Sequence, residues 1–299
     1  MLNSPIQEII DDLLFEKGVK LFVKRDDMIH PHISGNKWRK MKYNLLAAKS
    51  TDTLLTFGGA YSNHIAATAA AGHEYGFKTI GVIRGEEHLP LNDTLKLAIE
   101  HGMKLYYVDR TTYKKRYLTE FWLDLKAQFG ECFIIPEGGA NLLGVQGCME
   151  ILDEVEIDFD IVCSACGTGS TLAGIIASMK SGKRAIGFPA LKNGAFIADE
   201  IRKFLTDKQL NGKEWYIETA YHFGGYAKYR PELISFIKRV KKISGIQLDP
   251  VYTGKMMFGI YDLIRNGKIG SGSTILAVHT GGLQGITGFE KRYGIKING

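Results

Sequence analysis

One lysine of this chain stands where it could act as a nucleophile. Residues 34–37 read Ser-Gly-Asn-Lys, so Lys37 directly follows a turn-forming triplet at an expected helix start. The positive end of a helix, with Arg39 and Lys40 nearby, favours the neutral and nucleophilic form of the Lys37 amine. A lysine in the first turn of a helix can equally be an ordinary solvated side chain. The segment makes Lys37 a candidate and leaves both interpretations open.

A second polar segment could bind an anion. Residues 54–64 read as a buried strand, a glycine turn and a polar triplet that opens an alanine-rich helix. Ser62 or Asn63 could simply cap this helix through a side-chain oxygen. The same geometry offers backbone N–H groups and short polar side chains to a substrate carboxylate. Because open α/β sheets bind ligands at the carboxyl ends of their strands, we keep both interpretations.

A third segment has the composition of a phosphate-binding loop. Residues 160–171 read as a strand, a loop of glycines and hydroxyls, and a helix start. It is not a dinucleotide fingerprint, because Leu172 takes the sixth position, and it has no nucleoside triphosphate lysine. A monophosphate fits better. A plain tight turn needs fewer glycines and hydroxyls than this loop contains: Gly167, Thr168, Gly169, Ser170 and Thr171.

Other reactive side chains have simpler explanations. Cys163 and Cys166 have redox-pair spacing, but no second pair completes a metal site, and a buried strand end accounts for them. His30 and His32 lack a third ligand nearby, so an exposed loop is expected and no metal is predicted. Near the C-terminus, Tyr252 and Thr280 lie in polar turns and could also be core residues.

The elements that must position these residues alternate along the chain. Short apolar runs mark strands at residues 21–23, 54–57, 79–83, 105–108, 133–135, 161–163, 186–188 and 275–278. Helical patterns cover residues 37–49, 63–75, 91–101, 143–155, 171–179 and 255–265. This alternation predicts an α/β protein with parallel sheets covered by helices. The 299 residues suit two domains, one of which could draw on both chain ends.

Composition excludes several classes of protein. The hydrophobic share of 45% and charged share of 23% are those of a globular protein, not a disordered or collagen-like one. A net charge of +6 without a groove-reading motif argues against nucleic-acid binding. The start lacks a basic stretch followed by an apolar one, and no apolar run could span a bilayer. We expect a cytoplasmic protein with no membrane partner.

Taken in order, these segments resemble the family of D-cysteine desulfhydrase and 1-aminocyclopropane-1-carboxylate deaminase, which are tryptophan-synthase-β-like, fold-type-II pyridoxal-phosphate enzymes. The matches are residues 4–7, 24–27, 35–37, 62–64, 136–139, 167–171, 249–255 and 279–282, nearly end to end. The resemblance implies two open, twisted, mostly parallel sheets flanked by helices, with pyridoxal 5'-phosphate between the lobes. Residues 1–38 and 145–299 would form the large domain and residues 39–144 the small one, in a homodimer.

The resemblance also implies roles for single residues. Lys37 would hold the cofactor covalently, Asn63 would bind its ring oxygen, and Thr280 would meet its ring nitrogen. Residues 167–171 would hold the phosphate, with Lys40 as a second cationic contact. Tyr252 would act as acid or base, and Ser62 would join it and Lys37 in catalysis. The expected substrate-binding residues are Ser62, Asn63, His64, Tyr252 and Thr253.

Two threonines narrow the reaction. Deaminases of the family carry glutamate at Thr253 and leucine at Thr280, so both positions here are of desulfhydrase type. A hydroxyl at Thr280 supplies no negative charge to keep the ring nitrogen protonated. The prediction is α,β-elimination from a small amino acid to pyruvate, sulfide and ammonia. The alternatives are deamination of 1-aminocyclopropane-1-carboxylate, a thiol oxidoreductase built on Cys163 and Cys166, or a non-catalytic ligand-binding protein.

The chain also departs from the family pattern. Ser34 replaces the first glycine of the usual Gly-Gly-Asn-Lys, which leaves the Lys37 assignment intact. Residues 221–226, Tyr-His-Phe-Gly-Gly-Tyr, are a candidate for altering the substrate. The substrate and its stereochemistry therefore stay open.

Overall fold

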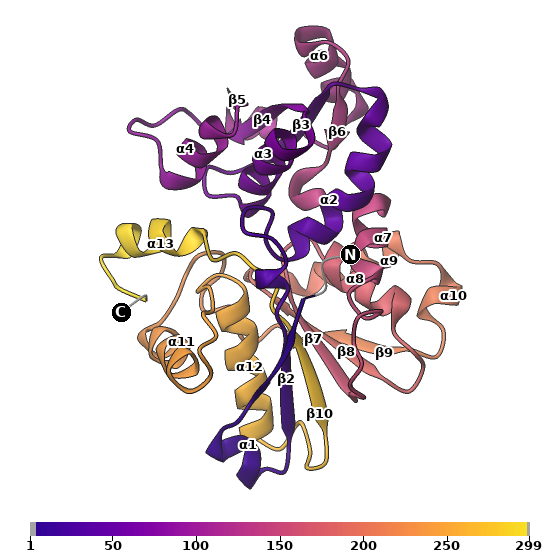
Figure 1. The fold of residues 1–299 in the computed structure, drawn as a ribbon, viewed down its shortest axis with the longest axis vertical. Helices are drawn as coiled ribbons and strands as arrows, with labels where there is room; N and C mark the ends of the chain where they lie inside the picture. Colours follow the sequence, from indigo (N-terminus) through magenta and orange to yellow (C-terminus); the bar gives the residue numbers. More distant parts are fainter. Residues whose placement is uncertain (1–3, 298–299) are drawn as a thin grey trace.

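The apolar runs assemble into two separate sheets in the computed structural model, which describes residues 4–297 (Figure 1). The ends of the predicted large domain, residues 1–3 and 298–299, lie outside these described residues. The larger sheet has the strand order β1 (Ile6–Ile9), β2 (Lys20–Lys24), β10 (Thr274–Val278), β7 (Ile161–Cys166), β8 (Arg184–Pro189) and β9 (Glu214–Ile217). Only β1 runs antiparallel to its neighbour. Because β2 pairs with β10, this sheet joins both chain ends.

The smaller sheet is parallel throughout. Its strand order is β5 (Met103–Val108), β4 (Lys78–Arg84), β3 (Thr53–Gly58) and β6 (Phe133–Ile135). Leu54, Leu55 and Phe57 of β3 are fully buried, although their side chains point to alternate faces. Continuous burial is typical of a parallel sheet that helices cover on both faces.

Helices cover both sheets. Around the smaller sheet lie α2 (Asn36–Ala47), α3 (Asn63–Tyr75), α4 (Asp93–Glu100), α5 (Arg110–Tyr113) and α6 (Thr119–Phe129). Around the larger sheet lie α1 (Asp12–Glu16), α7 (Leu142–Met149), α8 (Ser170–Ser178), α9 (Ile197–Phe204), α10 (Asp207–Leu210), α11 (Pro231–Ser244), α12 (Thr253–Arg265) and α13 (Gly285–Tyr293). One hydrophobic core joins α11, α12 and α13 to one face of the larger sheet, and another joins α7, α8 and α9 to the opposite face.

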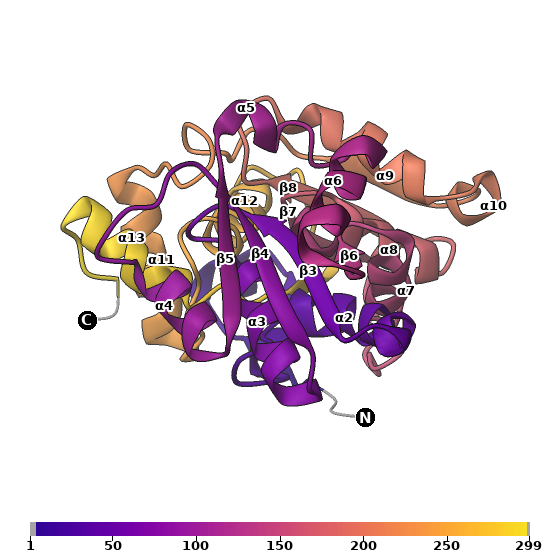
Figure 2. The same cartoon turned by 90° about the horizontal axis from the view of Figure 1, so that it is seen from above.

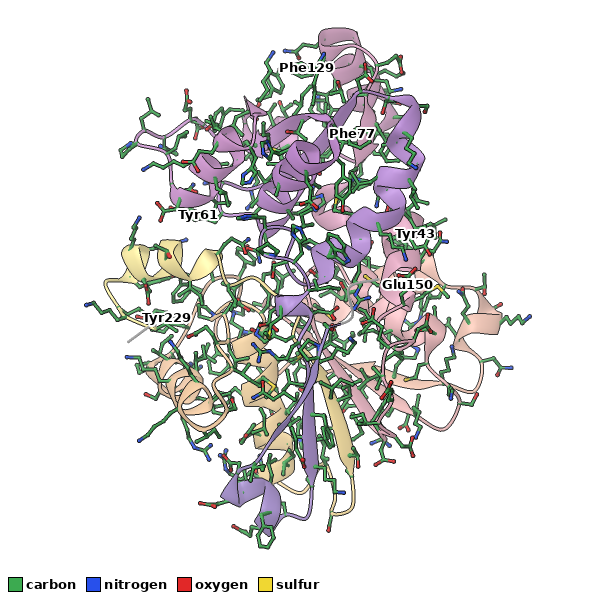
Figure 3. The ribbon with its side chains drawn as sticks, viewed as in Figure 1. Tyr43, Tyr61, Phe77, Phe129, Glu150 and Tyr229 are labelled. Carbon is green, nitrogen blue, oxygen red and sulfur yellow. The ribbon has the colours of Figure 1, made fainter. Side chains whose placement is uncertain are left out.

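The two lobes meet along several contacts. Helices α2 and α7 approach so closely that a Cβ on Gly147 would lie 1.9 Å from the Arg39 carbonyl oxygen. Figure 3 shows Tyr43 beside Glu150, and the Tyr43 hydroxyl donates to that carboxylate at 2.6 Å. On the other side, α4 lies next to α13 (Figure 2), where the Lys291 amine binds the Asp93 carboxylate at 2.6 Å. The predicted domain boundaries at 38/39 and 144/145 fall inside α2 and α7.

The predicted fold class, two mostly parallel sheets flanked by helices, is confirmed. Each of the eight predicted strands is present, whereas β1 and β9 were not predicted, because these edge strands bury few side chains. The helix predicted over residues 143–155 ends at Met149. The turns that follow it direct Glu150 and Glu154 to cations on α2. No helix within residues 4–297 is long and apolar enough to cross a membrane.

Candidate active site

Helix α2 starts directly against the end of β10, and Gly35 makes this possible. Gly35 has φ 66°, and a Cβ there would lie 2.0 Å from the Thr280 carbonyl oxygen. No side chain fits this gap, so only glycine permits the approach. The Asn36 N–H then donates to the Thr280 carbonyl at 3.2 Å. Lys37 is therefore fixed close to Thr280, although the two residues are far apart in sequence. Thr280 is the residue predicted to meet the ring nitrogen of the cofactor.

The Lys37 amine has no carboxylate partner among residues 4–297. Its Nζ donates only to the Gly138 carbonyl, at 3.4 Å, and the Lys40 Nζ donates to the same oxygen at 3.0 Å. Burial lowers the pKa of Lys37 well below its usual value, and the positive charge of Lys40 lowers it further. Burial also lowers the pKa of Lys40. The sequence predicts a neutral, nucleophilic Lys37 amine from the neighbouring charges. In the structure burial favours the neutral amine more strongly than those charges do.

Arg39 does not belong to this group of cations, because its guanidinium turns away from Lys37. It donates to the Glu154 carboxylate at 2.5 and 2.7 Å and to the Asp26 carboxylate at 3.1 and 3.2 Å. Lys24 joins the same group through a 2.7 Å bond to Glu154. Lys24 and Asp26 are fully buried, and Arg39 is 3% exposed. This buried ion network ties α2, and with it Lys37, to β2 and the segment after α7.

The network predicts a steep loss of stability for Glu154→Gln. Burial opposes ionisation of Glu154, but hydrogen bonds from Arg39 and Lys24 lower its pKa to about 2. Because the pKa in the folded state is depressed, the stabilisation is complete above the unfolded value near 4.5 and is lost as pH falls toward about 2. We expect Glu154→Gln to lower the free energy of unfolding by about 3 kcal/mol at pH 7.

Urea unfolding of Glu154→Gln and wild type at pH 7 and at pH 3 tests this. The difference between the two proteins should shrink at pH 3. Glu131→Gln is the matched control, because the Glu131 side chain is 83% exposed in its ion pair with Lys126. A Glu154→Gln protein as stable as wild type at pH 7 would contradict the role of the network.

The loop after β7 keeps the features of an anion site. Gly169 adopts φ 83° and precedes α8, whose first N–H groups have no acceptor within the helix. The hydroxyls of Thr168 and Ser170 lie 3.1 Å apart. Negative charge is stabilised at such a helix start. The loop also lies beside the lysines, because a Cβ on Gly138 would be 3.0 Å from the Thr168 methyl group.

The fifth residue of this loop, Thr171, has a partner on α2. The Asn36 side-chain amide donates to the Thr171 hydroxyl at 2.8 Å. Asn36 is a residue that the sequence analysis gave no role. Its position next to Lys37 was the available signal, but its contact partner lies 135 residues away.

Ser62 caps α3, as one of the two interpretations of this segment predicts. Its hydroxyl oxygen accepts from the His64 N–H at 3.2 Å and from the Ile65 N–H at 3.4 Å. Both bonds use the oxygen as acceptor, so the hydroxyl hydrogen is left for another group. Asn63 accepts a 2.6 Å bond from the Gln284 amide through its carbonyl oxygen. Because the carbonyl oxygen of Asn63 is used in this way, its amide nitrogen is the atom that can donate to another group.

His64, which we predict to face the substrate, is buried beside the site lysines, and its role at the substrate stays a prediction. The side chain is 2% exposed, and its Nε2 lies 2.8 Å from the Thr56 hydroxyl. Its Nδ1 has no hydrogen-bond partner in the described part of the chain. Burial lowers the pKa of His64 well below its usual value, and the charges of Lys37 and Lys40 lower it further. His64 is a neutral side chain in the interior beside the two lysines.

Asp249 organises the turn that carries Tyr252 and Thr253. Its carboxylate accepts from the N–H groups of Val251, Tyr252 and Thr253, each at 2.8 Å. The Thr253 hydroxyl donates to the same carboxylate at 2.7 Å and accepts from the Asp249 N–H at 3.0 Å. Thr253 is fully buried. The Thr253 hydroxyl holds the turn, because both of its hydrogen bonds go to Asp249. Substrate binding by Thr253 stays a prediction.

The Tyr252 hydroxyl lies at the phosphate-type loop, since a Cβ on Gly167 would be 3.5 Å from it. Burial raises the pKa of Tyr252 well above its usual value, so the hydroxyl stays protonated. Tyr226 stands beside it, with ring centroids 6.0 Å apart and nearly perpendicular planes. Residues 221–226 were a predicted candidate for altering the substrate, with no role assigned to any one of them. The structure brings Tyr226 to Tyr252.

The two cysteines with redox spacing are core residues. Cys163 packs on one face of the larger sheet and Cys166 on the other. Burial raises the pKa of Cys166 to about 12 and raises that of Cys163. Reactive thiols have lowered pKa values and face solvent. This placement argues against the oxidoreductase alternative.

The histidines near Pro31 do not form a metal site. His30 stacks on Trp38 at 4.8 Å between ring centroids, and its Nδ1 accepts from the N–H groups of His32 and Ile33. No group of three or more potential metal ligands occurs within the described range.

These residues fit the cofactor that the resemblance implies. A buried amine without an anionic partner suits covalent attachment of an aldehyde. Residues 167–171 offer hydroxyl groups and the start of α8 to a phosphate, and the Tyr252 ring lies against Gly167. Asn63 presents an amide donor, and Thr280 lies at the start of α2. Each expected contact of pyridoxal phosphate thus has a residue at the junction of the lobes.

Comparisons with known proteins agree with this site. A family model described as pyridoxal-phosphate dependent enzyme matches residues 10–281. The chain is 32% identical to a Pyrococcus horikoshii protein provisionally named 1-aminocyclopropane-1-carboxylate deaminase, over 95% of this chain and 90% of that protein. It is 30% identical to the bifunctional D-cysteine desulfhydrase/1-aminocyclopropane-1-carboxylate deaminase of Arabidopsis thaliana, over 90% of this chain and 74% of that protein. A crystal structure described as an ACC deaminase homologue matches with a TM-score of 0.82 at 31% identity, covering 97% of this chain and 92% of that one. The chain therefore belongs to the pyridoxal-phosphate dependent enzymes, in the family of 1-aminocyclopropane-1-carboxylate deaminase and D-cysteine desulfhydrase.

Proposed function

We propose that this enzyme eliminates the β-thiol of D-cysteine and releases pyruvate, sulfide and ammonia. The observation that carries the proposal is the Lys37 amine, which is buried without a carboxylate partner and lies beside both Gly138 and the loop after β7. We further propose that the large and small domains divide as the sequence analysis predicts, and that the enzyme is a homodimer.

The roles of the residues follow from their contacts. Pyridoxal phosphate, when bound, stabilises negative charge that develops at the α-carbon of an amino acid. Lys37 would hold the cofactor, and its amine would take the α-proton, because a lowered pKa keeps the amine neutral. Asn63 would hold the cofactor ring through its amide nitrogen, since its carbonyl oxygen accepts from Gln284. Tyr252, protonated up to high pH, donates its proton to the departing thiolate.

The substrate carboxylate fits the start of α3. The hydroxyl hydrogen of Ser62 and the first N–H groups of the helix are donors there. The choice of elimination over ring opening rests on Thr280, whose neutral hydroxyl cannot hold a proton on the ring nitrogen by charge. Thr253 supports this choice only indirectly, because it is buried against Asp249.

A second candidate is deamination of 1-aminocyclopropane-1-carboxylate, because relatives of this chain carry that name. Incubation of the purified enzyme with each amino acid separates the two. We expect sulfide and pyruvate from D-cysteine, and little oxobutyrate from the cyclopropane substrate. Faster release of oxobutyrate than of pyruvate would overturn the proposed function. L-cysteine and D-serine in the same panel identify the stereochemistry and the leaving group.

Ser62→Ala tests the carboxylate site. We expect KM for the amino acid to rise about tenfold, because a hydrogen bond to the substrate carboxylate is lost. The free energy of unfolding should also fall by about 1 kcal/mol, because the cap of α3 is lost. Asn92→Ala is a matched control: Asn92 caps α4 by accepting from the Leu95 N–H at 3.1 Å. The control should lose similar stability and keep its KM. Equal KM values in the two variants would make Ser62 a capping residue only.

A further inference from the structure

Lys255 is a buried lysine that binds only main-chain oxygens. It is 1% exposed, and its Nζ donates to the carbonyls of Gly225 at 2.7 Å, His222 at 2.9 Å and Ala190 at 3.4 Å. No carboxylate in residues 4–297 pairs with it. Burial lowers the pKa of Lys255 to about 8. Burying an ammonium group is costly unless its donors are hydrogen-bonded. The three carbonyl acceptors offset this cost, and the contacts they create indicate what Lys255 does in the fold.

Two of the three acceptors belong to an irregular loop between β9 and α11. In this loop Phe223 and Ala227 have φ 53°, although neither is glycine, and Gly225 has φ 119°. Such backbone conformations persist only where surrounding contacts hold them. Two more hydrogen bonds hold the loop. The Tyr221 hydroxyl donates to the Asp262 carboxylate at 2.8 Å, and the Tyr293 hydroxyl donates to the Ala227 carbonyl at 2.8 Å. Lys255 holds the middle of the loop.

The third acceptor connects Lys255 to the phosphate-type loop. Ala190 follows β8, and its N–H donates to the Cys166 carbonyl at 3.0 Å, directly before Gly167. Lys255 also lies in the first turn of α12, whose N-cap residue is Tyr252. One amine therefore joins the loop that carries Tyr226, the strand end beside Gly167, and the helix that follows Tyr252.

We propose that Lys255 is a positioning residue that holds Tyr226 against Tyr252 and so sets the geometry of the substrate side of the site. Tyr226 directly follows Gly225, whose carbonyl accepts the shortest of the three bonds. The other ring, Tyr252, is fixed by the Asp249 turn. Without the Lys255 amine, only the Tyr226 side of the pair loses its anchor. The inference about catalysis rests on the proposed function, whereas the anchoring of the loop does not.

Lys255→Met tests the proposal, because methionine keeps the length and apolar stem of lysine and removes its donors. We expect amide hydrogen exchange to rise in the peptide covering residues 219–229, and kcat/KM for D-cysteine to fall about 10- to 100-fold, as for a small misplacement of a reacting group. The visible absorbance of the bound cofactor should stay unchanged. Lys255→Arg, which keeps donors, should recover part of the loss in both measurements.

Lys213→Met is the matched control. The Lys213 amine also binds two main-chain carbonyls, of Ile176 at 2.6 Å and Ala177 at 2.7 Å, at the far end of α8. This variant should lose stability and keep kcat/KM within about twofold, because its contacts lie at the end of α8 opposite to the phosphate-type loop. If Lys255→Met loses no more activity than Lys213→Met, Lys255 is a structural residue only, and the proposal is wrong.

A double-mutant cycle with Tyr226→Phe shows whether Lys255 acts through Tyr226. The Tyr226 and Tyr252 hydroxyls interact. We expect the two losses in kcat/KM to be less than additive, since Lys255→Met displaces the Tyr226 hydroxyl that Tyr226→Phe removes. Additive losses, or wild-type exchange of residues 219–229 in Lys255→Met, would overturn the proposal. Hydrogen exchange needs no substrate. A wild-type enzyme inactive on the amino-acid panel would therefore sink the proposed function alone, and the exchange result would still decide the anchoring.

Discussion

Replacing Lys37 with alanine is expected to remove the visible absorbance of the bound cofactor, near roughly 410–430 nm, and to lower turnover of D-cysteine by about 10³-fold or more. The reason is that Lys37 supplies both the covalent attachment and the amine that moves the α-proton. Its amine is buried, has a lowered pKa and, within the described residues, donates only to the Gly138 carbonyl. Absorbance spectra with added pyridoxal phosphate and a coupled pyruvate assay measure the two effects.

Lys40→Ala is the informative comparison, because Lys40 binds the same carbonyl at 3.0 Å and its pKa is also lowered by burial. If Lys40 only contributes charge near the phosphate, this variant should keep the absorbance band and need more cofactor for saturation. Lys49 is exposed just after the end of α2, so Lys49→Ala should behave as wild type in both measurements. A Lys37→Ala protein that keeps the band while Lys40→Ala loses it would reverse the assignment.

Tyr252→Phe is expected to lower kcat by about 10²- to 10⁴-fold, the usual contribution of a positioned acid or base. The phenylalanine ring keeps the contacts with Gly167 and Tyr226, so cofactor binding should be retained. Because burial raises the pKa of Tyr252 well above its usual value, its ionisation should cause no loss of activity in a pH profile up to about 10. Steady-state kinetics between pH 7 and 10 measure both effects.

Tyr261→Phe is a suitable control for Tyr252→Phe. Tyr261 is 1% exposed and lies on α12, the helix that Tyr252 precedes. Its hydroxyl has no hydrogen-bond partner in residues 4–297. Removing a buried, unpaired hydroxyl should not destabilise the protein, so this variant should keep full activity. If Tyr252→Phe is as active as Tyr261→Phe, then Tyr252 is not the acid.

Much of the fold was predictable, because fully buried strands of parallel sheets are continuous apolar runs. The runs at residues 54–57 and 161–163 lie within β3 and β7, and the helix predicted at residues 63–75 coincides with α3. The edge strand β9 alternates exposed and half-buried residues, so its weak apolar signal was missed. The helix predicted to Val155 ends at Met149, and the turns that follow it bring Glu150 and Glu154 to cations on α2, tertiary contacts that no local pattern reveals.

The site was predictable in its residues more than in its contacts. Glycines and hydroxyls after β7 indicate an anion site whatever surrounds them. By contrast, the role of Thr253 depends on Asp249, and that of His64 depends on burial between Thr56 and the two lysines. A carboxylate four residues before Thr253 was a local signal for a side-chain-capped turn. The burial of His64 had no local signal.

The most direct test of the account is to find which lysine carries the cofactor. Borohydride makes the linkage between a lysine amine and the pyridoxal aldehyde permanent, and mass spectrometry of the digested protein then locates the added mass. We expect the added mass on Lys37 alone, with none on Lys40, which binds the same carbonyl. A label on Lys40, or a cofactor-loaded protein with no labelled lysine, would contradict it.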